Sequence, residues 1–222
     1  MSGPFCYPEE LLHRLALNAE APKTQRTRLR LMAATAALLA RRGFHDVRVA
    51  DVAEQAGVAH GTFYRYWPDR AAATQDVLAD FMATISARRP PRAGDKPLYE
   101  RIVAANRYYV GVYRRNAGLM RCLMQLGNSD PGFARIGQQA NLALARRVLR
   151  AWEREEPAVR DLPEQERMAR ALACIAMVEG VLRDLYVRPA IEPLDAMREE
   201  EVADLLSACW FRTLFGREPP GA

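Results

Sequence analysis

The sequence predicts an all-α protein, on two observations. Apolar residues recur at steps of three and four along most of the chain, which is the spacing of one helix face. No stretch of useful length alternates apolar and polar residues in the way that a half-buried strand does. Half of the 222 residues are apolar and 27% are charged. This balance is typical of globular domains, so the helices have enough apolar surface to share a core.

Local start and stop signals place the helices of the N-terminal part. Thr24 is suited to cap a helix start, Gly43 to end that helix, and Gly57 to separate two short helices. An additional amphipathic helix is expected at 8–19. Residues 1–22 carry a net charge of −2, which favours packing on the body over gripping DNA. The remaining helices expected here are 24–42, 49–56, 59–67 and one that begins near 68.

The segment 88–97 divides the chain, because it holds three prolines and a glycine. Beyond it, Asp130 and Pro131 form a cap and a first-turn proline, which together open a helix. The helices expected in this part are 98–116, 119–126, 131–154, 164–187 and 194–215. We therefore expect an extension at 1–22, a small domain at 23–70 whose last helix runs on to about 88, and a helical domain at 89–222.

Positive charge is concentrated in one part of the chain. Residues 23–70 hold nine basic and four acidic residues, a surplus equal to the net +5 of the whole chain. Such clusters favour the phosphate backbone of nucleic acids or an anionic membrane surface. The sequence has no apolar run of about 20 residues and no signal-peptide pattern. These features predict a cytoplasmic protein without a membrane partner.

A helix-turn-helix motif lies inside this basic segment. The motif needs a small residue where its helices cross and a glycine in the tight turn, and Ala53 and Gly57 meet these demands. Apolar residues must also pin the second helix onto the first, and these are Val52, Ala56, Val58, Phe63 and Tyr66. The exposed residues at the start of the second helix are then candidates for entering a major groove: His60, Gly61, Thr62, Tyr64 and Arg65.

Residues 24–70 resemble the DNA-binding domain of the tetracycline-repressor (TetR) family of bacterial transcription regulators. The residues that carry the resemblance are Gly43-Phe44, Val49, Asp51-Val52-Ala53, Ala56-Gly57-Val58, Gly61-Thr62-Phe63-Tyr64, Tyr66-Trp67 and Arg70. The resemblance implies a three-helix DNA-binding domain, a homodimer and an inverted-repeat operator on double-stranded DNA. It also implies a C-terminal domain whose small-molecule effector releases the protein from DNA and from the nucleoid. Beyond residue 70 the likeness is limited to length and helical layout.

The resemblance also implies particular contacts to DNA. His60, Gly61 and Thr62 match positions of the recognition helix that contact bases or adjacent phosphates. Tyr64 matches a tyrosine that meets the DNA backbone, and Arg70 stands where a lysine commonly touches phosphate.

Three positions depart from the pattern of the family. Arg48 and Ala59 replace the Ser or Thr that usually caps the second and third helices, so each helix start loses an acceptor worth about 1 kcal/mol. Arg48 is instead a candidate for a direct phosphate contact. His60 replaces a common lysine with a side chain that changes charge near neutral pH. A pH-sensitive contact and a neutral hydrogen-bonding side chain are both open readings of His60.

The C-terminal part has the residue types of an apolar ligand site but no motif. Aromatic residues and methionines with a few polar anchors are typical of such sites, and they equally suit a plain core. The candidates are Asn106, Tyr109, Tyr113, Met120, Met124, Phe133, Gln138 and Asn141. Glu179 is a further candidate, because it falls within the apolar stripe of helix 164–187. It can bind a cationic ligand, pair with Arg183 or lie at the wet edge of the stripe.

A stripe of small residues on one helix, together with apolar residues of the last helix, suggests a dimer interface. Ala169, Ala173, Ala176 and Gly180 form one stripe of helix 164–187. Val202, Leu205, Cys209 and Trp210 follow on the last helix. Together they predict a four-helix interface across a two-fold axis, although the same stripes also suit the core of a monomer.

No catalytic constellation is visible. The chain has three histidines, no GxSxG motif, no glycine-rich phosphate loop and no metal-ligand spacing, so we expect neither an enzyme nor a cofactor nor a metal site. The alternative to a ligand-released repressor is a redox-sensing one that uses Cys122, Cys174 or Cys209. These thiols lie among apolar residues, where thiolate formation is disfavoured.

Overall fold

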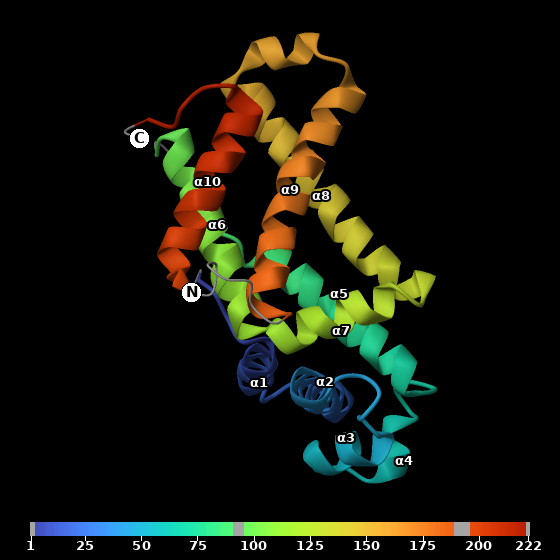
Figure 1. The fold of residues 1–222 in the computed structure, drawn as a ribbon. Helices are drawn as coiled ribbons and strands as arrows, with labels where there is room; N and C mark the ends of the chain where they lie inside the picture. Colours follow the sequence, from blue (N-terminus) through green and yellow to red (C-terminus); the bar gives the residue numbers. More distant parts are fainter. Residues whose placement is uncertain (1–2, 91–95, 189–195, 221–222) are drawn as a thin grey trace. The chain divides into compact units, whose positions relative to one another are not determined.

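The computed structural model is all-helical over the residues that it describes, which are 3–90, 96–188 and 196–220, and this confirms the predicted fold class (Figure 1). Within this part of the chain, no helix is long and apolar enough to cross a membrane. The helices are α1 (Tyr7–Leu17), α2 (Lys23–Arg42), α3 (Val49–Gln55), α4 (His60–Phe63), α5 (Arg70–Ala87), α6 (Leu98–Arg115), α7 (Ala117–Gly127), α8 (Pro131–Glu155), α9 (Glu164–Tyr186) and α10 (Glu199–Phe215), with a 3-10 turn at Pro157–Asp161.

Most helix bounds agree with the sequence predictions to within two residues. The exceptions are the stretch 59–67, of which only His60–Phe63 is α-helical, and the last helix, which begins at Glu199 and not at 194. Thr24 does not cap α2, because the helix begins at Lys23 and has Pro22 at its cap position. Thr24 instead offers its backbone carbonyl to the hydroxyl of Tyr66, at 3.0 Å. The predicted start of the last helix at 194 lies outside the described residues.

The chain forms two compact units, each made from separate stretches of sequence. The first, here called the helix-turn-helix unit, comprises Phe5–Ile85 and Arg115–Gly137. The second, here called the C-terminal unit, includes Ser86–Arg114 and Gln138–Ala222. The domain limits at 22, 70 and 88 were expected on functional grounds and stay a prediction.

Helix α2 is the centre of the helix-turn-helix unit, and α1, α3 and α7 all pack against it. Its inner residues are 2% exposed or less: Leu31, Met32, Ala36, Leu38 and Leu39. Burial of one such aliphatic side chain stabilises the folded state by roughly 1.5–3 kcal/mol. The apolar face of α2 therefore holds the unit together.

A glycine-dependent cap connects α3 to α4. Gly57 has a φ of 65°, the left-handed region that glycine adopts at little cost. The Val58 N–H donates to the carbonyl of Ala53, and the Gly57 N–H donates to the carbonyl of Glu54, both at 3.0 Å. This pair of bonds is the Schellman arrangement, which ends a helix within one turn. It turns the chain sharply between the two helices of the motif.

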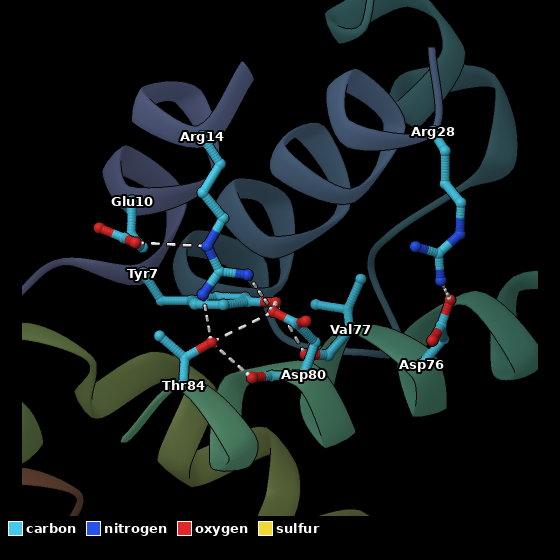
Figure 2. Close-up of polar contacts among 8 residues, drawn as sticks. All are labelled: Tyr7, Glu10, Arg14, Arg28, Asp76, Val77, Asp80 and Thr84. Carbon is cyan, nitrogen blue, oxygen red and sulfur yellow. Dashed lines mark hydrogen bonds and ion pairs between the residues drawn. The ribbon is translucent and has the colours of Figure 1, made fainter. Parts of the chain in front are cut away.

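The N-terminal extension forms the predicted helix, α1, and packs on the body of the unit (Figure 2). Tyr7 is completely buried, and its hydroxyl donates to Asp80 Oδ2 on α5 at 2.7 Å. Arg14 Nη1 donates to the same oxygen at 2.9 Å. The side chain of Asn116 accepts the Tyr7 N–H at 2.8 Å and donates to the Phe5 carbonyl at 2.7 Å. Through these contacts, α1 is bound to other parts of the helix-turn-helix unit.

In the C-terminal unit, α9 and α10 pack against each other, and buried polar contacts join α10 to α6. Asn106 on α6 donates to Ser207 Oγ on α10 at 3.0 Å, and both residues are at most 2% exposed. Val202 and Trp210 are buried, so these two members of the expected dimer stripe face the core of the unit. Val202 and Trp210 therefore do not offer a surface to a second chain, because the face of α10 that carries these two residues points into the unit.

Gly118 permits a close approach of α7 to α2. A Cβ atom at this position would lie 2.0 Å from the carbonyl oxygen of Ala40, well inside contact distance. A Cβ at Gly137 on α8 would meet nothing within 4 Å.

We expect Gly118→Ala to lower the free energy of unfolding by about 1–3 kcal/mol, because α7 must move away from α2. Gly137→Ala should leave stability unchanged or raise it by up to about 1 kcal/mol, because alanine suits a helix interior better than glycine. Urea denaturation of the two variants measures this difference. Equal stabilities would contradict the close packing of α7 on α2.

Candidate nucleic-acid interface and ligand cavity

Helix α4 turns one side chain inward and leaves its neighbours outside. Phe63 is 1% exposed and lies against Trp67, with ring centroids 5.5 Å apart. The predicted contact residues around it are exposed or half-buried: His60, Gly61, Thr62, Tyr64 and Arg65. The structure thus gathers these five residues on one short segment, and their contacts to DNA stay a prediction.

Aromatic contacts order the exposed segment. The rings of His60 and Tyr64 meet edge to face at 5.4 Å, and Tyr64 remains 50% exposed. The Trp67 Nε1–H donates to Asp76 Oδ2 on α5 at 2.9 Å, and Arg28 of α2 pairs with the same oxygen (Figure 2). The Asp76 carboxylate thus connects α5 both to α2, through Arg28, and to the segment that follows α4, through Trp67.

Arg48 and Arg70 differ in whether their guanidinium groups are free to bind phosphate. The Arg48 side chain is exposed directly before α3, and its guanidinium group makes no hydrogen bond or ion pair with a described residue. Arg70 Nη1 donates to the carbonyls of Val47 and His45, at 2.6 and 3.1 Å, and its Cζ lies 4.2 Å from the Phe44 ring centroid. Arg70 therefore braces the turn before α3, a role that sequence reasoning missed, and its contact with phosphate stays a prediction.

Neither motif helix has a side-chain cap, as the residue types predicted. Ala59 occupies the cap position of α4 with extended backbone, φ −64° and ψ 143°, and no side-chain hydrogen bond. At the start of α3, the Arg48 N–H makes only a long 3.4 Å contact with Asp51 Oδ2, which also pairs with Arg42. The first amides of both helices therefore lack a side-chain oxygen from their own cap residue.

The C-terminal unit contains a cavity of about 390 Å³. It lies among α6, α8 and α10 and is mainly apolar. The lining residues are Arg89, Pro90, Lys96, Leu98, Arg101, Ile102, Ala104, Ala105, Asn106, Tyr109, Leu144, Arg147, Val148, Ala151, Trp152, Arg154, Trp210, Leu214 and Phe215. The volume falls at the low end of the range of about 300–1,000 Å³ for small-molecule sites.

Two of the predicted ligand residues, Asn106 and Tyr109, line this cavity. Met120, Met124 and Phe133 belong to the helix-turn-helix unit, where Met120 and Phe133 are buried in its core. Gln138 is exposed on α8. The sequence signal of apolar residues at helical spacing does not separate a cavity wall from a packed core, because both need the same residue types.

Tyr113, Asn141 and Glu179 form a separate cluster in the C-terminal unit, outside the lining of the cavity. Asn141 Nδ2 donates to Glu179 Oε2 at 3.0 Å. Burial raises the pKa of Glu179, against the lowering effects of Asn141 and Arg183. The Arg183 guanidinium pairs with Asp184 instead, with Nε 3.0 Å from Oδ1. Glu179 thus has an amide partner inside the protein.

The cavity also contains residues that the sequence reasoning did not single out. Trp152 and Trp210 line it, with exposures of 2% and 9%. Arg89 lies beside Tyr109, with Cζ 5.2 Å from the ring centroid. Burial raises the pKa of Tyr109 to about 12, so its hydroxyl stays protonated at neutral pH. A search for arginines at helical spacing beside large aromatics would have found part of this set.

The buried cysteines do not support a redox sensor. Cys122 and Cys174 are each 1% exposed. Burial raises the pKa of both thiols, that of Cys174 to about 12. The thiolate is the form that reacts with oxidants, and at these two positions it is disfavoured.

Residues 31–72, which cover most of α2, all of α3 and α4, and the start of α5, match the model of the bacterial regulatory proteins of the tetR family. The chain carries a tetR-family DNA-binding domain. It is also 37% identical over 82 residues to the HTH-type transcriptional repressor KstR of Rhodococcus jostii (strain RHA1). That match covers 37% of this chain and 38% of the relative, so the chain spans well under half of the length of that repressor.

Solved structures share the fold beyond the tetR-family domain. A transcriptional regulator from Rhodococcus sp. Rha1 aligns over 83% of this chain and 96% of its own, with 19% identity and a TM-score of 0.66. Salmonella enterica GusR aligns over 88% and 98%, with 15% identity and a TM-score of 0.69. The arrangement of helices is therefore one that solved regulators adopt.

The empty cap position of α4 provides a test of the local structure of the motif. We expect Ala59→Ser to raise the free energy of unfolding by about 1 kcal/mol, because the backbone already has cap geometry and a hydroxyl can accept an amide of the first turn. Ala83→Ser, at an exposed site within α5, should lower it by a few tenths of a kcal/mol. Thermal unfolding measures both, and a loss of stability in Ala59→Ser would contradict the cap geometry.

Proposed function

We propose that the chain is a DNA-binding transcriptional repressor of the TetR type. In this proposal it binds an inverted-repeat operator on the nucleoid as a homodimer, and a small molecule in the C-terminal unit releases it. The observation that carries the proposal is the exposed α4 segment within a tetR-family domain. The second helix of a helix-turn-helix enters the major groove with its N-terminal residues against the base edges.

The role proposed for each residue at the DNA follows from its exposure and charge. Arg65 and His60 are exposed on the α4 segment and contact base edges or the phosphates beside them. Arg48, with no partner among the described residues, contacts phosphate at the start of α3. Tyr64 packs edge to face on His60 and meets the backbone with its exposed hydroxyl. Phosphate contacts set the position on the duplex, and base contacts select the sequence.

Release by a ligand needs a connection between the cavity and the DNA-binding residues. Helix α6 supplies Arg101, Asn106 and Tyr109 to the cavity and ends one residue before Asn116. Asn116 holds the backbone of Phe5 and Tyr7 in the helix-turn-helix unit. We propose that a ligand favours one position of α6 and thereby changes the separation of the two recognition helices in the dimer. A ligand shifts such an equilibrium only by its preference for one state.

The dimer contact is proposed on the outer faces of α9 and α10. Leu172 and Leu205 are 37% and 46% exposed, so both large apolar side chains are available to a partner. Ala169, Ala173 and Ala176 are exposed on the same helix as Leu172, so a partner helix can approach closely. A two-fold dimer brings the same face of each chain together.

We expect the full chain to bind promoter DNA beside its own gene, with an affinity that falls as salt rises, because phosphate contacts release counterions. Arg65→Gln should weaken binding by about ten-fold. Arg48→Gln should reduce the slope of log affinity against log salt by about 1. Fluorescence anisotropy at several salt concentrations measures both effects. Arg150→Gln, an exposed site on α8, is the control of equal charge change, and salt-independent binding would contradict the proposal.

A matched pair of leucines tests the dimer. Leu172 on α9 and Leu142 on α8 are each 37% exposed. We expect Leu172→Asp to yield monomers, because it places a carboxylate in the proposed interface, and Leu142→Asp to remain dimeric. Light scattering after size exclusion measures the mass of each. A wild-type monomer, or dissociation by the α8 variant alone, would contradict this interface.

A further inference from the structure

The charged side chains that line the cavity of the C-terminal unit all have the same sign of charge. Its charged lining residues, among those the structure describes, are all cations: Arg89, Lys96, Arg101, Arg147 and Arg154. Only Arg101 has a described carboxylate partner, Glu155. The rest of the wall is largely aliphatic and aromatic. Lys96, Arg147 and Arg154 are exposed to water. Arg89 is half-buried, and a cation there is costly unless it meets an anion or water.

Several hydrogen-bond donors at this cavity are buried without a partner. The Nε atoms of Arg89 and Arg101 and the indole Nε1 of Trp152 are inaccessible to solvent and have no hydrogen-bond acceptor. Arginine and tryptophan side chains can only donate. Each buried donor without an acceptor costs free energy, and native structures have few of them. Three such donors belong to side chains that line one cavity, so its wall has more hydrogen-bond donors than acceptors.

We infer that the effector is an apolar molecule with a carboxylate at one end, and that Arg89, which has no described carboxylate partner, receives this carboxylate. Guanidinium groups are the side chains best matched to a carboxylate, because they donate through two parallel N–H groups. The aliphatic side chains of α6, α8 and α10 enclose the hydrocarbon part. The inference deepens the proposed effector function and rests on it, and it replaces a purely apolar ligand with an apolar anion.

Three probes of equal chain length test the head group: decanoate, 1-decanol and decylamine. Calorimetric titration of each into the full DNA-free chain at pH 7 measures affinity. A change in tryptophan fluorescence that persists in a Trp67→Phe variant reports binding beside Trp152 and Trp210. We expect decanoate to bind about ten-fold or more tightly than 1-decanol, because charged hydrogen bonds are worth more than neutral ones. Decylamine should bind most weakly.

Variants of the cavity cations separate charge recognition from simple burial. Arg89→Gln should weaken decanoate binding by about ten-fold and leave 1-decanol unchanged, and Arg89→Lys should recover part of the loss. Arg147→Gln, at an exposed position on α8, should give a smaller loss and does not depend on a buried side chain. Arg146→Gln is the matched control, because Arg146 is next to Arg147 in the sequence but its side chain does not line the cavity.

Equal binding of decanoate and 1-decanol would overturn the inference, as would wild-type decanoate affinity in both the Arg89 and Arg147 variants. The absence of any decanoate binding would overturn it too. None of these results depends on DNA. Operator binding by the same preparation tests the proposed regulator separately, so the two failures are distinguishable.

Discussion

The helix-turn-helix unit depends on the close contact between α7 and α2 at Gly118. Any side chain larger than hydrogen at this position would run into the Ala40 carbonyl, so α7 can approach the central helix this closely only with a glycine here. From α7 the constraint extends to α1, since Asn116 precedes α7 and fastens the backbone of Phe5 and Tyr7. The DNA-binding motif is thus supported by a helix that lies some 60 residues further along the chain.

Two carboxylates of α5 organise the same unit electrostatically. Asp80 takes hydrogen bonds from Tyr7 and Arg14 of α1, and Asp76 pairs with Arg28 of α2. Both acids are about a third exposed, so the charge attraction in these pairs is screened by water and contributes about 0–1 kcal/mol each. Because the α5 acids find their partners inside the unit, they leave the exposed cations near α3 and α4 uncompensated by α5.

The sequence predicted the motif well because its demands are local. A glycine at the turn and an apolar residue such as Phe63 at the right offset specify the geometry within a dozen residues. The cavity was harder to predict, because its wall combines residues from α6, α8 and α10 that only the tertiary structure brings together. Met120 and Phe133 illustrate the limit, since their apolar character fits a cavity wall equally well but they are packed in the other unit.

The distribution of charge along the sequence does not reveal the cations that line the cavity of the C-terminal unit. Residues outside 23–70 have no net charge in sum, which suggests a neutral sensing body. In the folded chain, however, Arg89, Arg101 and Arg147 come from three separate stretches of sequence and share one cavity. Acids balance them in the count but, apart from Glu155, not in the described surroundings of the cavity. A net charge summed along the sequence therefore identifies a site built from one contiguous segment, such as the DNA-binding motif, and misses one assembled by tertiary packing.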